Sequence, residues 1–348
     1  MSKIPTLSKA KKETQSVLKW GGISLIGVLC LFMGIKLITF TINFLNPPLP
    51  EAAFGKLSAI PFPNQTKENL TYSLDTITGF LPNFSDRAKV YKITPNPPDL
   101  LGLDKTSKTL AKVGFSSSGN QVSEDTYKWI DQNKSFQRTI TMNIFSSDFT
   151  LSSSYLSSES LQTFSGSDEK NMAIDTAKSF LTDMSLFPPD IDENKTKITL
   201  YSITNNSLTL TSKISDTKIV KVDFFQKDLD GLPIYYDRGI SSTIDFLIGK
   251  ENKILKVVDA RFFHKNISET SSTYAIKTAK EAYLELQQGQ AYIAYKPADT
   301  VEFTIKKIYL GYYAGENNQE FMMPIVIFEG NNNFIAYVSA VKDEWINN

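Results

Sequence analysis

A long apolar segment near the N-terminus constrains this chain more than any other feature. Residues 21–35 contain no charged side chain, and the apolar character resumes after Lys36 and continues to Leu45. A membrane-spanning helix needs about 20 mostly apolar residues, so residues 20–45 are predicted to form a transmembrane anchor. Asn46 and the prolines after it would end this helix, because proline removes a backbone donor and clashes with the preceding turn.

The charges around this segment predict its orientation. Only Glu13 opposes the five lysines that precede it, Lys3, Lys9, Lys11, Lys12 and Lys19. The positive-inside rule then makes residues 1–19 a cytoplasmic tail and places the C-terminal bulk outside the cell membrane. A cleaved signal peptide is the alternative, with a mature N-terminus near Ala53, but its apolar core would span only about 7–15 residues. We therefore expect an uncleaved single-pass anchor in contact with membrane lipid.

Composition narrows the classes of partner and compartment. Six of the 37 basic residues and one of the 37 acidic residues lie in residues 1–45, so the remainder carries 31 basic and 36 acidic side chains. A mildly acidic body is unsuited to nucleic acid. The single cysteine, Cys30, excludes a disulfide-stapled scaffold. We favour a bacterial cell envelope over a glycosylated eukaryotic location, although seven Asn-x-Ser/Thr sequons begin at Asn64, Asn69, Asn83, Asn133, Asn194, Asn205 and Asn266.

Proline spacing and an internal repeat predict the domain organisation. Nine prolines interrupt residues 46–100, which we interpret as a stalk leading into the first strands, with a proline-rich ligand segment as the alternative. Farther on, Ala173–Lys178 matches Ala275–Lys280 at an offset of 102 residues. Each copy has apolar residues at helical spacing, with Asp168 and Ser272 as candidate N-caps. We therefore predict two related helices, and a degenerate third copy at residues 107–115.

Runs of alternating residues follow each predicted helix and indicate antiparallel strands, one of them at Ser207–Ser212. Asp228–Gly231 and Gly249–Asn252 are predicted to be hairpin turns, because glycine, asparagine and aspartate tolerate the positive φ angles that such turns need. Within residues 301–313 the alternation changes phase, which predicts a β-bulge at Lys306 and Lys307. The resulting fold class is α+β, with tandem units of one helix packed on an antiparallel sheet. The predicted units are residues 101–167, 168–268 and 269–348.

A family resemblance rests on the layout of the last two units. The segment Ile219–Phe263, with Gly231-Leu-Pro-Ile234 between hairpins behind an alanine-containing helix, resembles PepSY-type domains. Tandem units behind one N-terminal span resemble extracytoplasmic regulators of the YycH/YycI type, whose C-terminal unit is similar in layout to residues 308–338. The resemblance implies association with a sensor kinase, and it offers no catalytic motif.

No set of residues in the sequence predicts catalysis, so we assign no catalytic, cofactor-binding or metal-binding residues. The one histidine, His264, is interpreted as a strand-end residue rather than a catalytic base. One histidine and one cysteine cannot build the usual transition-metal clusters. Four acidic residues lie around one predicted hairpin, Asp223, Asp228, Asp230 and Asp237. We interpret them as ordinary turn residues, with a calcium site as the alternative.

Aromatic residues suggest where a partner could bind. Neighbouring residues of a strand point to opposite faces, so pairs such as Tyr312-Tyr313 place one ring in the core and one outside. Outward tyrosines are common at interfaces, while cross-strand pairing is the alternative. Tyr309, Tyr313 and Trp345 are the first positions to test.

These observations lead to a functional hypothesis. We expect a non-enzymatic, membrane-anchored protein that binds a protein or peptide partner in the cell envelope, with regulation of a membrane kinase or protease as one role. A structural spacer in a surface assembly is the alternative. An unrecognised hydrolase ranks last, and it would require Asp228 or Asp230 to be essential for more than stability.

Overall fold

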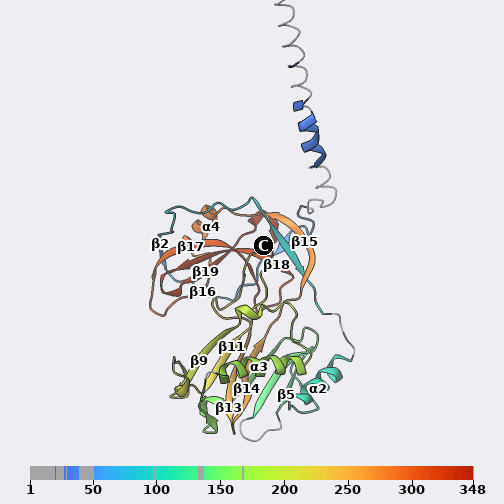
Figure 1. Cartoon of the computed structure of the whole chain (residues 1–348), viewed down its shortest axis with the longest axis vertical. Coiled ribbons are helices and arrows are strands. Elements are labelled where there is room, and N and C mark those ends of the chain that lie inside the picture. Colours follow the sequence, from blue (N-terminus) through green and yellow to red (C-terminus); the bar gives the residue numbers. More distant parts are fainter. Residues whose placement is uncertain are drawn as a thin grey trace, which may run out of the picture. The chain divides into compact units, whose positions relative to one another are not determined.

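The computed structural model describes residues 20, 27, 28, 30–38, 51–96, 99, 101–131, 137–166 and 168–347. The chain divides into two compact units, Met1–Pro50 and Glu51–Asn348. Within the first unit, the described residues are helical, and Figure 1 draws the run at residues 30–38 as a short ribbon. All the strands among the described residues belong to the second unit.

The predicted transmembrane anchor is contradicted. Among the residues that the structure describes, none of the helices is both long and apolar enough to span a membrane. Residues 21–26, 29 and 39–45 of the predicted span lie outside the described residues, as does the predicted tail at 1–19. The single-pass location, its orientation and the lipid partner were all inferred from that anchor, and they are corrected with it.

Ten strands form the larger sheet of the second unit, in the order β10-β9-β11-β13-β14-β7-β6-β5-β4, with β8 also paired to β13. All its pairings are antiparallel. Its strands are β4 (Asn120–Gln121), β5 (Thr126–Ile130), β6 (Arg138–Asn143), β7 (Phe149–Ser153), β8 (Leu161–Gln162), β9 (Lys197–Thr204), β10 (Ser207–Leu210), β11 (Ile219–Asp223), β13 (Ile244–Glu251) and β14 (Ile254–Phe262).

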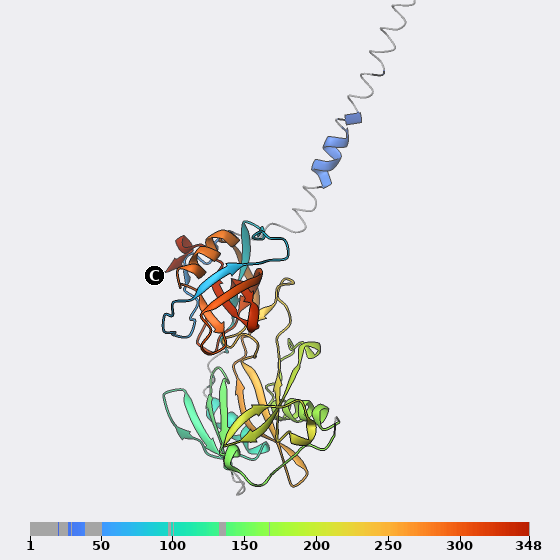
Figure 2. The ribbon, with the colours of Figure 1, turned by 90° about the vertical axis from the view of Figure 1, so that its left-hand side faces the viewer.

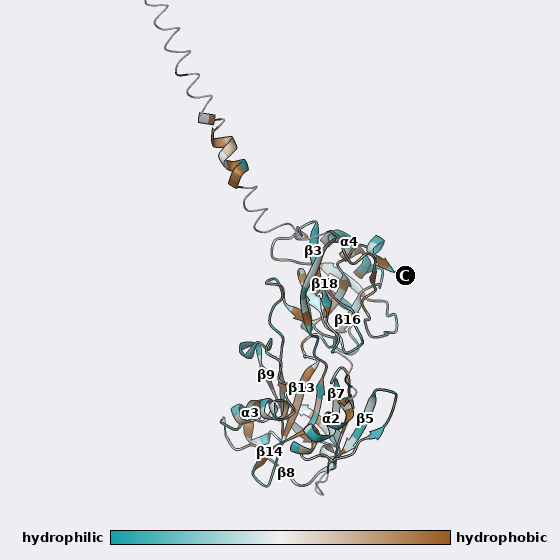
Figure 3. Cartoon of the chain, turned by 90° about the vertical axis from the view of Figure 1, so that its right-hand side faces the viewer, coloured by the Kyte–Doolittle hydropathy of each residue, from teal (hydrophilic) through white to brown (hydrophobic). Residues whose placement is uncertain are grey.

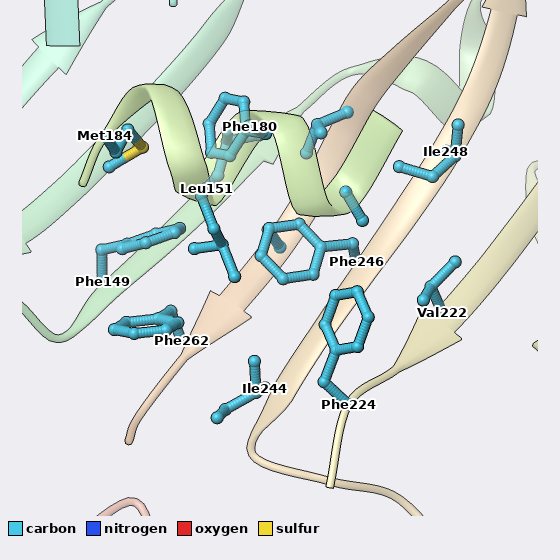
Figure 4. Close-up of a cluster of buried hydrophobic side chains, with 14 of the residues drawn as sticks. Phe149, Leu151, Phe180, Met184, Val222, Phe224, Ile244, Phe246, Ile248 and Phe262 are labelled. Carbon is cyan, nitrogen blue, oxygen red and sulfur yellow. The ribbon is translucent and has the colours of Figure 1, made fainter. Parts of the chain in front are cut away.

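Helices α2 (Gly102–Lys112) and α3 (Asp168–Asp183) cover one face of this sheet. Helix α3 packs on β11, β13 and β14. Figure 4 shows its Phe180, and Met184 just after its end, among Phe149, Leu151 and Phe246 of the strands. Strand residues alternate in direction, so every second residue of these strands enters this core. Figure 3 shows the hydrophobic colour on central strands such as β13 and hydrophilic colour around β5.

The opposite face of the ten-stranded sheet holds a smaller apolar cluster. Tyr155 of the 3₁₀ helix η1 (Tyr155–Ser157) and Leu161 pack there on Ile219, Leu247 and Val258. Side chains from β9 and β10 extend this cluster toward the edge of the sheet, namely Tyr201, Ile203 and Leu208. The ten-stranded sheet is therefore apolar on both faces near β9 and β10.

Eight strands form the second sheet, in which β12-β17-β18-β19-β16 are consecutive and β2, β3 and β15 complete the set. The views in Figures 1 and 2 show its strands grouped with helix α4 (Ala279–Gln287). Its strands are β2 (Thr71–Leu74), β3 (Arg87–Ile93), β12 (Ile234–Tyr235), β15 (Ile267–Ala275), β16 (Tyr292–Tyr295), β17 (Glu302–Tyr313), β18 (Phe321–Gly330) and β19 (Ile335–Ser339).

A two-stranded sheet ties the N-terminal end of this unit to the C-terminal end of the chain. Strand β1 (Leu57–Ser58) pairs in parallel with β20 (Ile346–Asn347). Leu57 and Ile60 are buried in the same core as Val341, and Phe62 stacks on Tyr292 with ring centroids 5.1 Å apart. Residues 51–62, which we predicted as part of a stalk, contribute to the core around the eight-stranded sheet. Short 3₁₀ helices complete the unit: η2 (Glu193–Lys195), η3 (Ile214–Asp216), η4 (Asn331–Asn333) and η5 (Asp343–Trp345).

The predicted fold class is wrong, because the unit is mostly strand and its strands join large sheets rather than repeated helix-on-sheet units. The two copies of the proposed repeat also differ. Ala173–Lys178 lies inside α3, whereas Ala275–Lys280 runs from the end of β15 through an isolated bridge at Ile276 into α4. The strand-forming run before Ile276 pairs with β3, and this pairing prevents the second copy from being helical throughout.

Individual features of the strands agree better with the predictions made from the sequence. The register of β17 against β18 shifts between Ile305 and Lys307, which confirms the predicted bulge. The turn predicted at Asp228–Gly231 forms, with positive φ angles at Asp230 and Gly231. The turn predicted at 249–252 lies later, at Asn252 and Lys253, because β13 continues to Glu251.

Candidate functional site: the outer edge of β10

The hairpin of β9 and β10 ends the ten-stranded sheet. Its two-residue turn is Asn205-Asn206, and both residues have positive φ angles, 52° and 55°. Two-residue hairpin turns that match the twist of their strands require positive φ at both positions, and asparagine tolerates this conformation better than most residues. The turn therefore fixes the register, in which Ser207 lies opposite Thr204 and Leu210 opposite Tyr201.

The main chain of β10 has hydrogen-bonding groups on its outer side. Just after the strand, the N–H of Thr211 donates to the carbonyl of Leu200 at 3.0 Å, so the odd-numbered residues face β9. The N–H and C=O groups of Leu208 and Leu210 therefore point away from β9. Strand β10 is the last strand in the order of this sheet, so the described strands offer these four groups no ladder partner.

The side chains of β10 are uncharged and partly apolar. Its sequence is Ser-Leu-Thr-Leu, and Leu208 packs against the cluster on the face opposite α3. Leu210 lies on the same face, but 70% of its surface is exposed. Natural edge strands are usually protected from pairing by charged residues, prolines, bulges or covering segments. The edge of β10 has no charge, proline or bulge.

An outer edge of the eight-stranded sheet shows such protection. The side-chain amide of Gln65 donates to the carbonyl of Ile293 at 2.6 Å and accepts from its N–H at 2.8 Å, which occupies the outer main-chain groups of β16 there. At the far end of the ten-stranded sheet, β4 is only two residues long. Compared with β16 and β4, the edge of β10 is therefore better suited to binding another strand.

Charged side chains cluster elsewhere on the ten-stranded sheet, around Asp259 of β14. Burial and the nearby carboxylate of Asp245 raise the pKa of Asp259 to about 7, while Arg261 and Arg238 oppose the rise. Arg261 also forms ion pairs with Asp245 and Glu316. This arrangement can hold or release a proton near neutral pH.

His264 follows β14, and its side chain is mostly buried. Its Nε2 atom lies 2.8 Å from Oδ1 of Asp190, and Asp190 also accepts from the amide of Gln226 at 2.7 Å. Burial alone would raise the pKa of Asp190, but the hydrogen bond and charge of His264 and the bond from Gln226 lower it. Catalysis by such a pair needs a nucleophile within reach of the histidine. Among the described residues, the ring of His264 contacts Asp190 and Phe262.

The four acidic residues considered for calcium do not converge. Asp223 pairs with Lys221 at 2.9 Å, Asp228 with Lys195, and Asp230 with Lys89 and Tyr91. Asp237 accepts from the Tyr313 hydroxyl and from the N–H of Glu316. Over the described ranges, no group of three or more histidine, cysteine or acidic residues is arranged to hold a metal ion.

The three aromatic positions chosen from the sequence all take part in internal packing. Tyr309 is half-buried and donates to Glu329, and its hydroxyl contacts that of Tyr235. Burial, followed by these two hydrogen bonds, raises the pKa of Tyr309 well above its ordinary value. Tyr313 is buried, and Trp345 packs edge-on against Tyr274 with ring centroids 5.9 Å apart. Cross-strand packing, the alternative that we considered, describes Tyr309 and Tyr313.

A shallow groove of about 480 Å³ lies along α3. Its walls include Met172, Asp175 and Asp183 of the helix and Leu255 of β14. Arg138 also lines it, but this guanidinium bonds Asp131 at 2.6 Å and two backbone carbonyls. The charge of Arg138 is therefore already paired within the protein. The residues that line the groove do not include any of β10.

Sequence reasoning found the strand but missed the site. A strand over Ser207–Ser212 was predicted, yet its place at the end of the sheet was not. The available signal was the Asn205-Asn206 pair between two alternating runs, followed by four uncharged residues. This pattern predicts a hairpin, but it does not show which strand of the hairpin is outermost.

Comparison with known proteins adds little to this picture. No protein-family model matches the chain, and no curated protein matches it. The crystal structure of an uncharacterized protein from Eubacterium rectale is similar over 78% of this chain and 89% of that chain, with 14% sequence identity and a TM-score of 0.35. A similarity at this level supports no argument about function. The resemblance to PepSY-type domains and YycH/YycI-type regulators stays a prediction.

Proposed function

We propose that this chain is a non-enzymatic binding protein that takes up an extended segment of a protein partner as an additional strand beside β10. One observation carries the proposal: the outer N–H and C=O groups of Leu208 and Leu210 have no ladder partner among the described strands, on an uncharged edge. Strand addition uses such main-chain groups for affinity and alternate side chains for specificity.

The surroundings of the edge support this mode of binding. Leu210, which is 70% exposed, extends the apolar surface formed by Tyr201, Ile203 and Leu208. An added strand would place every second side chain on this surface, so a segment with alternating apolar residues fits best. Burying the exposed part of Leu210 would add an apolar contribution to the main-chain hydrogen bonds.

A proline substitution tests the main-chain contribution. Leu210→Pro removes an outward N–H and leaves the bonds of Thr209 and Thr211 to β9 in place, and proline is tolerated on edge strands. The matched control, Leu210→Ala, shortens the same side chain but keeps the donor. Peptides of about eight residues with alternating apolar positions, selected by display on the full chain, would serve as the probe.

We expect Leu210→Pro to weaken binding of the selected peptides at least about tenfold and Leu210→Ala to weaken it less. A hydrogen bond to the added strand is worth about 1 kcal/mol, and proline also disturbs its neighbours. Bound peptide should also slow amide exchange at residues 208 and 210. Selection that yields no binder, or binders equally sensitive to both substitutions, would contradict strand addition at this edge.

A further inference from the structure

We infer that the strand taken up at this edge is β10 of a second copy of the chain, paired antiparallel about a twofold axis that passes beside Thr209. The inference rests on the proposed function, because it requires the edge of β10 to accept a strand. It adds the identity of the partner and the register of the pairing.

The main-chain pattern of β10 is self-complementary. Leu208 and Leu210 both carry outward-facing N–H and C=O groups, and Thr209 lies between them. In an antiparallel pair centred on Thr209, Leu208 of one copy exchanges two hydrogen bonds with Leu210 of the other, and the symmetric pair repeats this. A twofold interface requires such reciprocity, because each surface must match itself.

The side chains fit the same register. Leu208 and Leu210 lie on one face of the sheet, so the exposed Leu210 of each copy would contact the partly buried Leu208 of the other. On the opposite face, the two Thr209 side chains would be direct neighbours in a non-hydrogen-bonded pair, where threonine pairs are favourable. The apolar surface of β9 and β10 would then continue from one copy into the next.

Charge does not oppose this pairing. Edge strands that must stay unpaired commonly carry lysine, because like charges repel across a symmetric pair. Between Lys197 and Lys213 the chain has no charged residue. In the proposed register Lys213 of one copy would lie opposite Asn205 of the other, so like charges do not face each other across the axis.

The length of the strand predicts the strength of the dimer. Four residues and two leucines per copy bury much less than the roughly 1,200 Å² of a stable interface, so we expect a weak dimer with a dissociation constant on the order of 100 µM. Sedimentation equilibrium of the full chain at concentrations on either side of this value should show a reversible monomer–dimer equilibrium. Thr209→Lys should weaken it at least about tenfold, because the two lysines would lie directly opposite each other across the twofold axis.

Cysteine substitution tests the register. Cα atoms of a non-hydrogen-bonded pair lie about 4.5 Å apart, which suits a disulfide. In a full chain carrying Cys30→Ser, since Cys30 is a free, exposed thiol, Thr209→Cys should form a disulfide-linked dimer on mild oxidation. Ser207→Cys is the matched control, because Ser207 is equally exposed but would lie opposite Thr211 of the second copy rather than opposite itself.

The outcomes separate this inference from the proposed function. Crosslinking of the Thr209→Cys chain but not of the Ser207→Cys chain, together with a dimer of the unmodified chain, supports the twofold pair. Equal crosslinking of both variants overturns it, as does a chain that stays monomeric in sedimentation. If the chain is monomeric while selected peptides still bind in a manner sensitive to Leu210→Pro, the second copy is the wrong partner and strand addition stands. If the peptides also fail, both proposals fall.

Discussion

Asp259 shows how the sheet controls the charge of a single residue. It lies on β14 opposite Leu247 and two residues from Arg261, and its carboxyl group is half-buried. Burial and the carboxylate of Asp245 raise its pKa from 3.8 to about 7, against the attraction of Arg261 and Arg238. The folded chain therefore binds a proton at Asp259 in a pH range where the unfolded chain has released it.

This difference predicts a pH-dependent stability. Between pH about 4 and about 7 only the folded state keeps the proton, so the contribution of Asp259 to stability falls as the pH rises through this window. Asp259→Asn removes the charge. After discounting for the partial exposure of the group, we expect the variant to be about 1–2 kcal/mol more stable than the natural chain at pH 8. At pH 4 the two chains should be equal.

Urea unfolding of both chains at several pH values measures this difference directly. Comparing the two chains cancels the titration of all groups that they share. A difference in stability that stays constant from pH 4 to pH 8 would show that Asp259 does not titrate in this window. A variant that is less stable at pH 8 would show that the carboxylate is favourably paired, contrary to the arrangement described here.

At the scale of the elements, α4 begins with a complete capping box. The Thr278 side chain accepts from the N–H of Glu281 at 3.2 Å, and the Glu281 carboxylate accepts from the N–H of Thr278 at 2.6 Å. This capping box satisfies two backbone donors that a helix start would otherwise leave unpaired. Helix α4 packs against β19, so its stability affects the core of the eight-stranded sheet.

Removal of the cap should therefore be measurable in the whole unit. We expect Thr278→Ala to lower the free energy of unfolding by about 1 kcal/mol. Thr176→Ala is the matched control, because Thr176 lies inside α3 and its hydroxyl bonds the carbonyl of Met172 within the same helix. Alanine has a higher helix propensity than threonine, so this control should be neutral or slightly stabilising. Equal losses in both variants would mean that the cap has no specific effect.

The same region shows why the sequence misled us about the repeat. Helical spacing of Ile276, Ala279 and Leu286 was visible, and the last two are indeed buried residues of α4. However, Thr273, Tyr274 and Ala275 pair with β3, which lies far away in the sequence. Local spacing cannot report a partner so distant in the chain, so the start of the helix was placed too early and Ser272 was chosen as its cap.

The positions of strands in the sequence were easier to predict than the strands with which they pair. Alternation located most strands after Lys197, and the phase change around Lys306 predicted a real bulge. Alternation does not encode the order of strands in a sheet, because that order depends on long-range pairing. The candidate edge at Leu208 and Leu210 could therefore be recognised only once β10 was known to be outermost.

At the scale of the whole molecule, residues 51–62 connect distant parts of the second unit. The N–H of Ala53 bonds the Ser272 hydroxyl at 2.8 Å, and the Tyr274 hydroxyl donates to the carbonyl of Gly55 at 3.0 Å. Leu57 is fully buried, and Ile60 is 8% exposed. A segment that the proline pattern marked as a stalk thus fills part of the core around the eight-stranded sheet.

Truncation tests this role. A chain of residues 51–348 keeps the whole second unit, and a chain of residues 63–348 loses the buried Leu57 and Ile60. Burying such side chains contributes about 1.5–3 kcal/mol each, so the shorter chain should melt roughly 10 °C lower than the longer one. Ser58→Ala in residues 51–348 is the control, because Ser58 is exposed beside Leu57 and should leave the melting temperature nearly unchanged.

Comparing these two truncated chains also tests strand addition, because the edge of β10 belongs to the ten-stranded sheet. If residues 51–62 stabilise only the eight-stranded sheet, the shorter chain should lose protection from amide exchange first in β15, β17 and β18 and retain it in β9 and β11. Peptide binding at β10 should then survive the truncation at low temperature. Equal melting temperatures for the two chains would show that Leu57 and Ile60 contribute little. Loss of protection in both sheets together would show that the second unit unfolds as a single cooperative body, in which the site at Leu208 and Leu210 depends on contacts made by the N-terminal segment.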